Sequence, residues 1–444
     1  MAGKSIVQVV KDGLCNGCGT CIALCPKEII KLNLDDKKGI YVPKINIKKC
    51  NNCGTCFKVC PGQEVDFKNL TLDIFGKNPD NILVGNYLKC YVGNSKSHDI
   101  RFNSTSGGLV TQLLIHALDE GIISGAIVTK MNFNKPLEPE PFIARTKEEI
   151  IEASKSKYCP VPVNIALKQI LKSEKNEKFA VVGLPCHIQG IRKAENSNSK
   201  LKEKISLHIG LFCGYTPNFL GTEFLLSKLG IEKENIRNLS YRCEGWPGNI
   251  KINLMDDDVI SLPVPNYFSN YISSKCYFFS MKKCFSCVDG TCELADISFG
   301  DAWLPEMYED KIGTSIVISK TINGDKLLQS MASKNKIQLK EINVEKVIES
   351  QRAMLYFKKI GSNGRKIFFN KISNYNTNLL EPDFIDKIIS LFPYFNAYMF
   401  SKPLLRKILY YIPPYFLWLY GYPYSILISI KSKDITSAKK EKTH

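Results

Sequence analysis

Two runs of cysteine near the start of the chain share one spacing. In each run, three cysteines stand three residues apart and a fourth, followed by proline, comes four residues later; the runs span residues 15–26 and 50–61. A 4Fe-4S cluster needs four converging thiolates, and in this spacing a tight loop supplies three while the cysteine before proline serves the other cluster. The repeat therefore predicts two 4Fe-4S clusters with these ligand sets: Cys15, Cys18, Cys21 and Cys60 for one, and Cys50, Cys53, Cys56 and Cys25 for the other.

Zinc is the alternative for such a repeat. Structural zinc sites use paired Cys-x2-Cys knuckles, whereas this spacing resembles that of the bacterial two-cluster ferredoxins. Gly19 and Gly54, which follow Cys18 and Cys53, leave backbone N–H groups free to approach cluster sulfurs and so to tune the reduction potential. We therefore expect the first part of the chain to carry single electrons.

Five more cysteines could hold a third centre. Cys186 and Cys213 each follow an apolar segment of buried-strand type, and Cys284, Cys287 and Cys292 lie in one later loop. Because α/β sheets bind ligands at the carboxyl ends of their strands, we interpret these residues as scattered ligands of a third 4Fe-4S cluster. Two alternatives stay open, which are a zinc site and a reactive thiol at Cys186 beside a histidine.

The elements that would position these residues alternate between strand and helix from about residue 82. Apolar spacing predicts a helix over 107–120, and the strands that we expect cover 126–129, 179–182, 205–212 and 315–320. Residues 250–264 predict a hairpin, and later helices are expected over 325–333 and 344–359. The helix after residue 107 opens with Ser, Thr and Gly, so its N–H groups could hold a phosphate, although capped helices without a ligand are common.

Composition excludes several classes of protein. The chain has 444 residues, 17 of them cysteine, with 44% hydrophobic and 23% charged residues and a net charge of +17. Such a chain is neither disordered nor collagen-like. The first residues lack an apolar signal region, so we expect a cytoplasmic protein whose cysteines bind metal rather than form disulfides. No nucleic-acid module is present, and the charge leaves an anionic cofactor or an acidic membrane surface open.

The C-terminal part is apolar and rich in tyrosine. Residues 408–430 contain no charged residue, but Pro413, Pro414 and Pro423 interrupt them. The length meets the criterion for a membrane span, whereas the prolines and aromatic residues favour an interfacial anchor or a short re-entrant hairpin. Docking on this or another protein is the third interpretation. An anchor would place the protein peripherally on the inner face of the membrane.

An ordered set of motifs resembles the coenzyme F420 hydrogenase/dehydrogenase beta-subunit family. These motifs lie at residues 104–111, 154–161, 182–189, 210–213, 241–248 and 284–301. The resemblance covers about residues 85 to 350 and follows a ferredoxin module, as in many members. It implies FAD in the α/β domain, a 4Fe-4S cluster near it, and coenzyme F420 as the substrate that exchanges hydride.

Carried onto this sequence, the resemblance implies site residues of two kinds. The flavin-side candidates are Ser106, Gly107, Gly108, Thr111, Lys155, Lys157, Tyr158, Gly183 and Pro185. The cluster-side candidates are Cys213, Cys284 and Cys287, with either Cys186 or Cys292 as the fourth ligand. Arg242 and the two lysines could neutralise cofactor phosphates. No catalytic residue is assigned.

The predicted fold combines α+β and α/β parts. The expected domains are a two-cluster ferredoxin domain at 1–75, a flavin and iron–sulfur α/β domain at 82–345, a helical extension at 346–400 and an apolar C-terminal tail at 401–444.

The leading hypothesis for function is an F420-dependent oxidoreductase that passes single electrons through its clusters to or from a ferredoxin or partner protein. Because the sequence Gly300-Asp301-Ala302-Trp303 resembles bacterial members found with polysaccharide-biosynthesis proteins, a flavin and iron–sulfur reductase acting there without F420 is the second. A non-catalytic electron-transfer subunit is the third.

Overall fold

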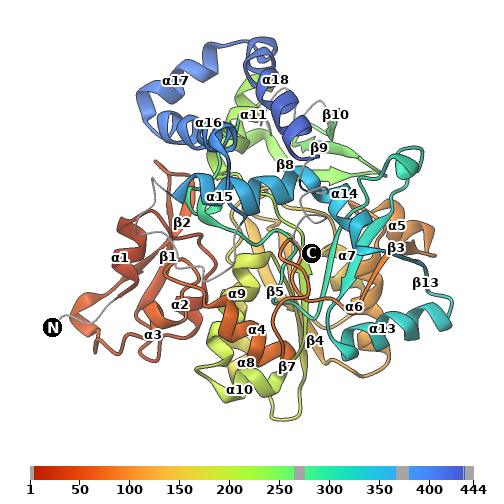
Figure 1. Cartoon of the computed structure of the whole chain (residues 1–444). Helices are drawn as coiled ribbons and strands as arrows, with labels where there is room; N and C mark the ends of the chain where they lie inside the picture. The colour runs from red at the N-terminus through yellow and green to blue at the C-terminus, as the bar shows by residue number, and fades with distance from the viewer. Residues whose placement is uncertain (1–4, 265–275, 367–379, 434, 436–444) are drawn as a thin grey trace.

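The computed structural model describes residues 5–264, 276–366, 380–433 and 435. A large mixed sheet with helices on both faces forms the centre of the molecule (Figure 1). The cysteine-rich N-terminal module lies against one side of this body, and the C-terminal helices gather at one end (Figure 1).

The N-terminal module is built around an antiparallel hairpin. Two short helices each begin after a glycine in the left-handed region, Gly19 at φ 89° and Gly54 at φ 73°, a conformation that other residues seldom adopt. The elements of the module are α1 Ile6–Lys11, α2 Thr20–Ala23, β1 Ile30–Asp35, β2 Ile40–Ile45, η1 Ile47–Lys49, α3 Thr55–Lys58 and α4 Phe67–Phe75.

Within the described residues, eight strands form the large sheet in the order β13-β3-β12-β11-β7-β6-β4-β5. The four strands β4, β6, β7 and β11 are parallel to one another, and the remaining pairings are antiparallel. The strand bounds are β3 Lys89–Ser95, β4 Gly125–Met131, β5 Pro139–Ala144, β6 Phe179–Gly183, β7 Ile205–Leu211, β11 Ile297–Asp301, β12 Ser315–Ser319 and β13 Ile337–Ile342.

Alternating side chains of the central strands build a separate core on each face. Val181 of β6 packs with α8, α9 and α10, whereas the adjacent Ala180 packs with α6 and α13. The helices of the sheet domain are α5 His98–Phe102, α6 Leu109–Asp119, α7 Lys147–Glu152, η2 Val163–Ala166, α8 Leu167–Lys172, α9 Pro185–Glu195, α10 Ser199–Lys204, α13 Ile322–Ser333 and α14 Val344–Leu355.

The core on the α9 side continues into the N-terminal module. Leu24, Val59 and Phe67 of that module belong to the same buried cluster as Ile188 of α9 and Leu167 of α8. The two parts of the chain therefore share one hydrophobic core.

A smaller antiparallel sheet packs against α11. It includes the hairpin expected at 250–264, which is present as β9 and β10. The elements of this region are α11 Phe219–Leu229, η3 Lys233–Asn235, β8 Ile236–Cys243, β9 Asn249–Leu254, β10 Val259–Pro263, η4 Lys282–Ser286 and η5 Pro305–Met307.

The C-terminal part is helical, as expected. The helix predicted over 344–359 is present, although it is α-helical only as far as Leu355 and continues as a π-helical turn, η6 Tyr356–Ile360. The remaining helices are α15 Gly361–Gly364, α16 Phe384–Phe400, α17 Pro403–Tyr411 and α18 Pro414–Lys431. No helix in the described part of the chain is long and apolar enough to cross a bilayer, so a membrane span is not found there.

Candidate functional site

The structure brings the eight N-terminal cysteines together in the two sets that their spacing predicts. Four of them, Cys15, Cys18, Cys21 and Cys60, line one small cavity. The other four, Cys25, Cys50, Cys53 and Cys56, line a second one. Each set combines three cysteines of one run with the cysteine–proline end of the other run, which is the exchange expected for two 4Fe-4S clusters.

Hydroxyl groups lie beside sulfur in both sets. Thr20 Oγ1 is 3.2 Å from Cys18 Sγ, and Thr55 Oγ1 is 3.4 Å from Cys53 Sγ. The hydrogen bond between the Cys53 and Thr55 side chains lowers the pKa of the Cys53 thiol. The repeat therefore carries the same tuning contact at both places.

A third set of cysteines includes Cys186 and Cys213, which follow the carboxyl ends of β6 and β7. Burial raises the pKa of the Cys186 thiol, and the next causes are the neighbouring sulfurs of Cys213 and Cys287. Cys284 and Cys287 raise the pKa of Cys213 in the same way, and the backbone N–H of Thr216 donates to Cys284 Sγ at 3.4 Å. Cys186, Cys213, Cys284 and Cys287 are thus close enough to influence one another electrostatically.

Cys292 has different surroundings. A Cβ placed on Gly210 of β7 would lie 2.4 Å from the Cβ of Cys292 and 2.6 Å from its Sγ, so this side chain is pressed against the strand. Burial raises the pKa of its thiol, Asp289 is the next cause that raises it, and Cys186 and Cys213 contribute less than Asp289. Cys186 is therefore better placed than Cys292 to complete the set.

Two buried lysines flank the third set. Burial lowers the pKa of Lys358, but Cys287, Cys213 and Cys284 together hold it above its ordinary value, so its ammonium stays charged. Lys283, also buried, lies near Cys287 of this set and near Cys60 of the N-terminal module. Sequence reasoning missed both lysines, because neither stands in a motif.

The three sets follow one another in space. Cys18 is near enough to Cys186 to raise the pKa of its thiol, and Cys56 does the same for Cys21. The line ends at Cys53, which is exposed. Within the described residues, no three His, Cys, Asp or Glu side chains converge as ligands of a single metal ion do.

A cavity of about 470 Å³ opens at the carboxyl ends of the parallel strands. It is lined by Thr129 of β4, Gly183 of β6, Leu211 of β7 and Phe299 of β11, together with the first turn of α6. Ligands of α/β proteins bind at this edge, and free N–H groups at a helix N-terminus suit a phosphate. Cys213, a member of the third cysteine set, also lines the cavity. The cavity and the third set are therefore neighbours.

Seven of the nine expected flavin-side residues line this cavity: Ser106, Gly108, Thr111, Lys155, Lys157, Tyr158 and Gly183. The other two lie just behind it. The backbone N–H of Gly107 donates to Ser315 Oγ at 2.9 Å, and Pro185 is the first residue of α9.

The cations of the cavity differ in their partners. Lys157 donates to the carbonyl oxygens of Ala153, Ser154 and Lys155 at 2.6, 2.7 and 2.9 Å, so its ammonium closes the turn after α7. Burial lowers its pKa to about 7. The expectation that Lys157 neutralises a phosphate therefore competes with these three carbonyls.

Arg242 presents a charge at the cavity wall. Its Nη1 lies 2.7 Å from Asp301 Oδ2, and its Nε donates to the carbonyl oxygen of Pro247 at 2.7 Å. Tyr215 also lines the cavity, and its buried hydroxyl has no hydrogen-bond partner among the residues that the structure describes. An apolar cavity with an arginine and an unpartnered hydroxyl fits a large ligand that carries polar groups.

Some lining residues gave no signal in the sequence. Gln351 and Met354 reach the cavity from α14, about fifty residues after the last motif. They have no characteristic spacing, so only the packing of α14 on the sheet reveals them.

The N-terminal module is fixed beside this site by hydrogen bonds as well as by the shared core. Asn164 Nδ2, fully buried, donates to Thr20 Oγ1 at 2.8 Å and to the carbonyl oxygen of His187 at 2.9 Å. The backbone N–H of Asn164 donates to the carbonyl oxygen of Cys18 at 2.8 Å, and Lys193 donates to that of Cys60 at 2.8 Å.

Three family descriptions match the chain. Residues 90–168 match the coenzyme F420 hydrogenase/dehydrogenase beta subunit N-terminal model, and residues 176–345 match the model of its C terminus. Residues 14–63 match a 4Fe-4S dicluster domain.

Curated relatives and a solved structure agree with these matches. The coenzyme F420 hydrogenase subunit beta of Methanothermobacter thermautotrophicus is 30% identical over 268 residues, which cover 59% of this chain and 87% of that protein. The coenzyme F420-dependent sulfite reductase of Methanocaldococcus jannaschii is 27% identical, over 83% of this chain and 54% of that protein.

The solved structure shows a similar fold. It is a chain of the F420-reducing [NiFe] hydrogenase complex from Methanosarcina barkeri, with a TM-score of 0.51 and 23% identity over 68% of this chain and 98% of that one. Together, the cysteine sets and these matches identify the chain as an iron–sulfur oxidoreductase that belongs to the coenzyme F420 hydrogenase/dehydrogenase beta-subunit family.

Proposed function

We propose that the chain binds FAD in the cavity and exchanges hydride with coenzyme F420, passing single electrons between this site and a partner protein. The observation that carries the proposal is the position of Cys213, which lines the cavity and also belongs to the third cysteine set. A bound flavin joins two-electron hydride chemistry to one-electron transfer, and the protein's part is to position it.

The residues of the cavity suit such a ligand. Its volume of about 470 Å³ lies within the roughly 300–1,000 Å³ of small-molecule sites. The first turn of α6 offers N–H groups to a phosphate. Arg242 offers a positive charge that Asp301 partly balances, and the Tyr215 hydroxyl is free to form a hydrogen bond. Apolar side chains such as Leu109 and Phe299 exclude water from the rest.

The cysteine sets support a fixed route for electrons. In this proposal a third 4Fe-4S cluster is held by Cys186, Cys213, Cys284 and Cys287, and the charged Lys358 offsets its negative charge. The route continues through the set of Cys18 and the set of Cys56. It reaches the surface at Cys53.

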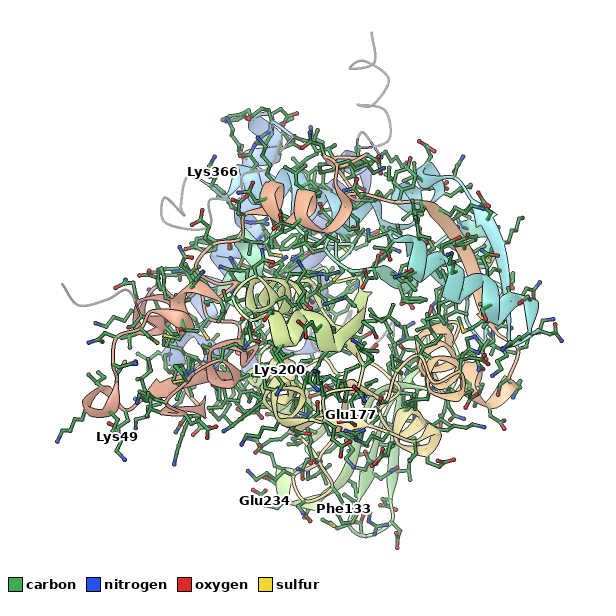
Figure 2. All side chains as sticks on the ribbon, turned by 90° about the horizontal axis from the view of Figure 1, so that it is seen from below. Lys49, Phe133, Glu177, Lys200, Glu234 and Lys366 are labelled. Carbon is green, nitrogen blue, oxygen red and sulfur yellow. The ribbon has the colours of Figure 1, made fainter. Side chains whose placement is uncertain are left out.

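A redox partner would dock where this route ends. Cys53 is exposed, and the exposed Lys48 and Lys49 precede it; Figure 2 shows Lys49 at the outer edge of the module. An acidic ferredoxin or an acidic patch on a partner subunit fits this basic rim.

Anaerobic purification followed by spectroscopy tests the proposal. We expect FAD to be released on denaturation, about twelve iron atoms per chain from three four-iron clusters, and bleaching of the flavin band by reduced F420 but not by NADH. A preparation with full iron but no flavin would contradict the proposal and favour a non-catalytic electron-transfer subunit.

A second candidate keeps the flavin and the clusters but not F420. It is a reductase that acts at the membrane on a precursor in polysaccharide biosynthesis, and the exposed apolar side chains of α16–α18 favour it because they suit a membrane surface. Flavin that dithionite reduces, but that neither reduced F420 nor NADH bleaches, would favour this candidate.

A further inference from the structure

The C-terminal helices expose most of their large apolar side chains. Figure 1 shows α16, α17 and α18 gathered at one end of the molecule. More than half of the exposed large apolar residues in the described part of the chain lie on these three helices. A patch of this kind is unusual on a monomeric protein in water and marks an interaction surface.

The amphipathic pattern of α17 is turned outward. Leu404, Ile408 and Tyr411 form a stripe at i, i+4 and i+7, with Leu404 80% and Tyr411 86% exposed. The opposite face is anchored, because Leu409 packs with Phe224 of α11. The helix therefore lies on the body of the protein with an apolar stripe facing away from it.

The same arrangement holds for the two neighbouring helices. On α18, Leu417 and Tyr424 are buried, while the exposed apolar side chains are Tyr415, Phe416, Leu419, Tyr420, Tyr422, Ile426, Leu427 and Ile430. On α16, Ile389 and Ala397 are buried, while the exposed ones are Phe384, Ile385, Ile388, Phe395 and Tyr398. These residues, with the stripe of α17, are called here the outer apolar face.

Hydrogen bonds hold this face in place. Lys228 of α11 donates to the carbonyl oxygens of Tyr410 and Ile412, both at 2.7 Å. The hydroxyl of Tyr420 donates to Asn396 Oδ1 at 2.7 Å, and Asn396 donates to the carbonyl oxygen of Cys276 at 3.0 Å. The apolar face is therefore part of the folded structure and not a loose tail.

Basic residues predominate around the face, and the acidic ones stand at one end of it: Asp383 precedes α16, Asp386 lies in its first turn, and both pair with Lys431. Residues 387–433 contain no aspartate or glutamate, and their charged residues are Lys387, Lys402, Arg406, Lys407, Lys431 and Lys433. Lys431 is paired with Asp383 at 2.6 Å, whereas Lys402 and Lys407 are exposed beside the stripe of α17. Basic residues that border an apolar and aromatic surface complement anionic lipid headgroups.

We propose that the outer apolar face of α16–α18 rests on an anionic lipid bilayer, with its side chains in the headgroup region and the helices parallel to the surface. Tyrosine and tryptophan are enriched at this depth in membranes, and the face is rich in tyrosine. A protein partner would need acidic groups and a hydrophobic surface of matching shape, whereas a lipid surface satisfies both requirements by its composition. The protein would therefore work at the membrane without crossing it.

Vesicle flotation with the purified full-length chain tests this proposal without any assay of activity. We expect the chain to float with vesicles of phosphatidylcholine and phosphatidylglycerol, and floating to decrease with phosphatidylcholine alone or with high salt. The double variant Leu404→Glu, Tyr411→Glu places charges on the stripe and should bind at least about tenfold less. Because both side chains are mostly exposed, this variant should fold.

A matched control is available at an exposed aromatic residue far from these helices in the sequence. Phe133, labelled in Figure 2, is 88% exposed in the turn between β4 and β5. Phe133→Glu should float like the unchanged chain, and circular dichroism should show all variants folded. Equal flotation of the α17 variant and the control would overturn the proposal. A dimer in light scattering that the α17 variant dissolves, with no vesicle binding, would also overturn it and assign the face to a second copy.

Discussion

Replacing Cys186 and Cys292 separately by alanine should decide which of them binds iron. Both side chains are candidates by sequence. After burial, the largest influence on the pKa of the Cys186 thiol is Cys213, whereas for Cys292 it is Asp289, with Cys186 and Cys213 contributing less. Cys292 instead sits against Gly210 and beside Asp289. We therefore expect Cys186→Ala to lose the third cluster and Cys292→Ala to keep it.

The expected sizes of the two effects differ clearly. Loss of one four-iron cluster lowers the iron content from about twelve to about eight atoms per chain, since the two N-terminal sets share no ligand with the third. Cys292→Ala removes one buried sulfur, for which a cavity cost of about 1 kcal/mol is reasonable, and its iron content should not change. The N-terminal clusters then act as an internal reference in both variants.

Iron and acid-labile sulfide analysis after anaerobic purification counts the iron atoms, and electron paramagnetic resonance of the reduced protein shows which clusters remain. Thermal unfolding measures the cavity cost in Cys292→Ala. In Cys186→Ala one of three signals should disappear, whereas Cys292→Ala should keep all three with a slightly lower melting temperature. Eight irons in Cys292→Ala and twelve in Cys186→Ala would refute the reasoning from side-chain surroundings.

Three further predictions concern the cavity, the docking of the modules and pH. Arg242→Met leaves the Asp301 carboxylate without its partner at 2.7 Å, so the free energy of unfolding should decrease by about 3–5 kcal/mol and the melting temperature should fall. The flavin-to-protein ratio should fall as well. Unchanged flavin content would show that Arg242 does not contribute to flavin binding. Asn164→Leu deletes two buried hydrogen bonds and should destabilise the contact with Thr20 by about 2–4 kcal/mol, seen as faster hydrogen exchange in residues 15–25 with iron content retained. Burial and Arg192 lower the pKa of His208, but Glu195 at 2.7 Å and Asp296 outweigh them and raise it above 6.5. The charged His208 therefore stabilises the folded state below pH 6.5, and this stabilisation is lost as pH rises through the raised pKa. Thermal unfolding of His208→Gln should lose this part of the pH dependence, and parallel curves for the two proteins would contradict it.

The parts of the site that could be predicted from sequence are those encoded by local spacing. The ligand sets of the N-terminal module follow from a repeat in which each loop fixes three cysteines, and the structure groups the same residues. The strands before Cys186 and Cys213 are apolar segments that a sheet buries on both faces, so their positions were predictable as well.

The parts that sequence could not reveal depend on long-range packing. Lys358 lies beside Cys287 because α14 and its π-helical turn pack across the sheet, and no local pattern encodes that contact. The choice between Cys186 and Cys292 depends on how closely Gly210 approaches one of them. The three carbonyl partners of Lys157 are local in sequence, but a lysine that closes a turn has no distinctive motif.

The N-terminal module and the sheet domain are packed so closely that glycine is required at their contact. A Cβ on Gly190 would lie 2.5 Å from Thr20 Oγ1, and one on Gly19 would lie 2.5 Å from the Ile165 side chain. Many electron carriers swing on a tether between donor and acceptor, and their turnover then slows as solvent viscosity rises. This chain has instead a rigid junction, so electron flow inside it should be independent of viscosity, and only the encounter with an external partner should respond to glycerol or sucrose.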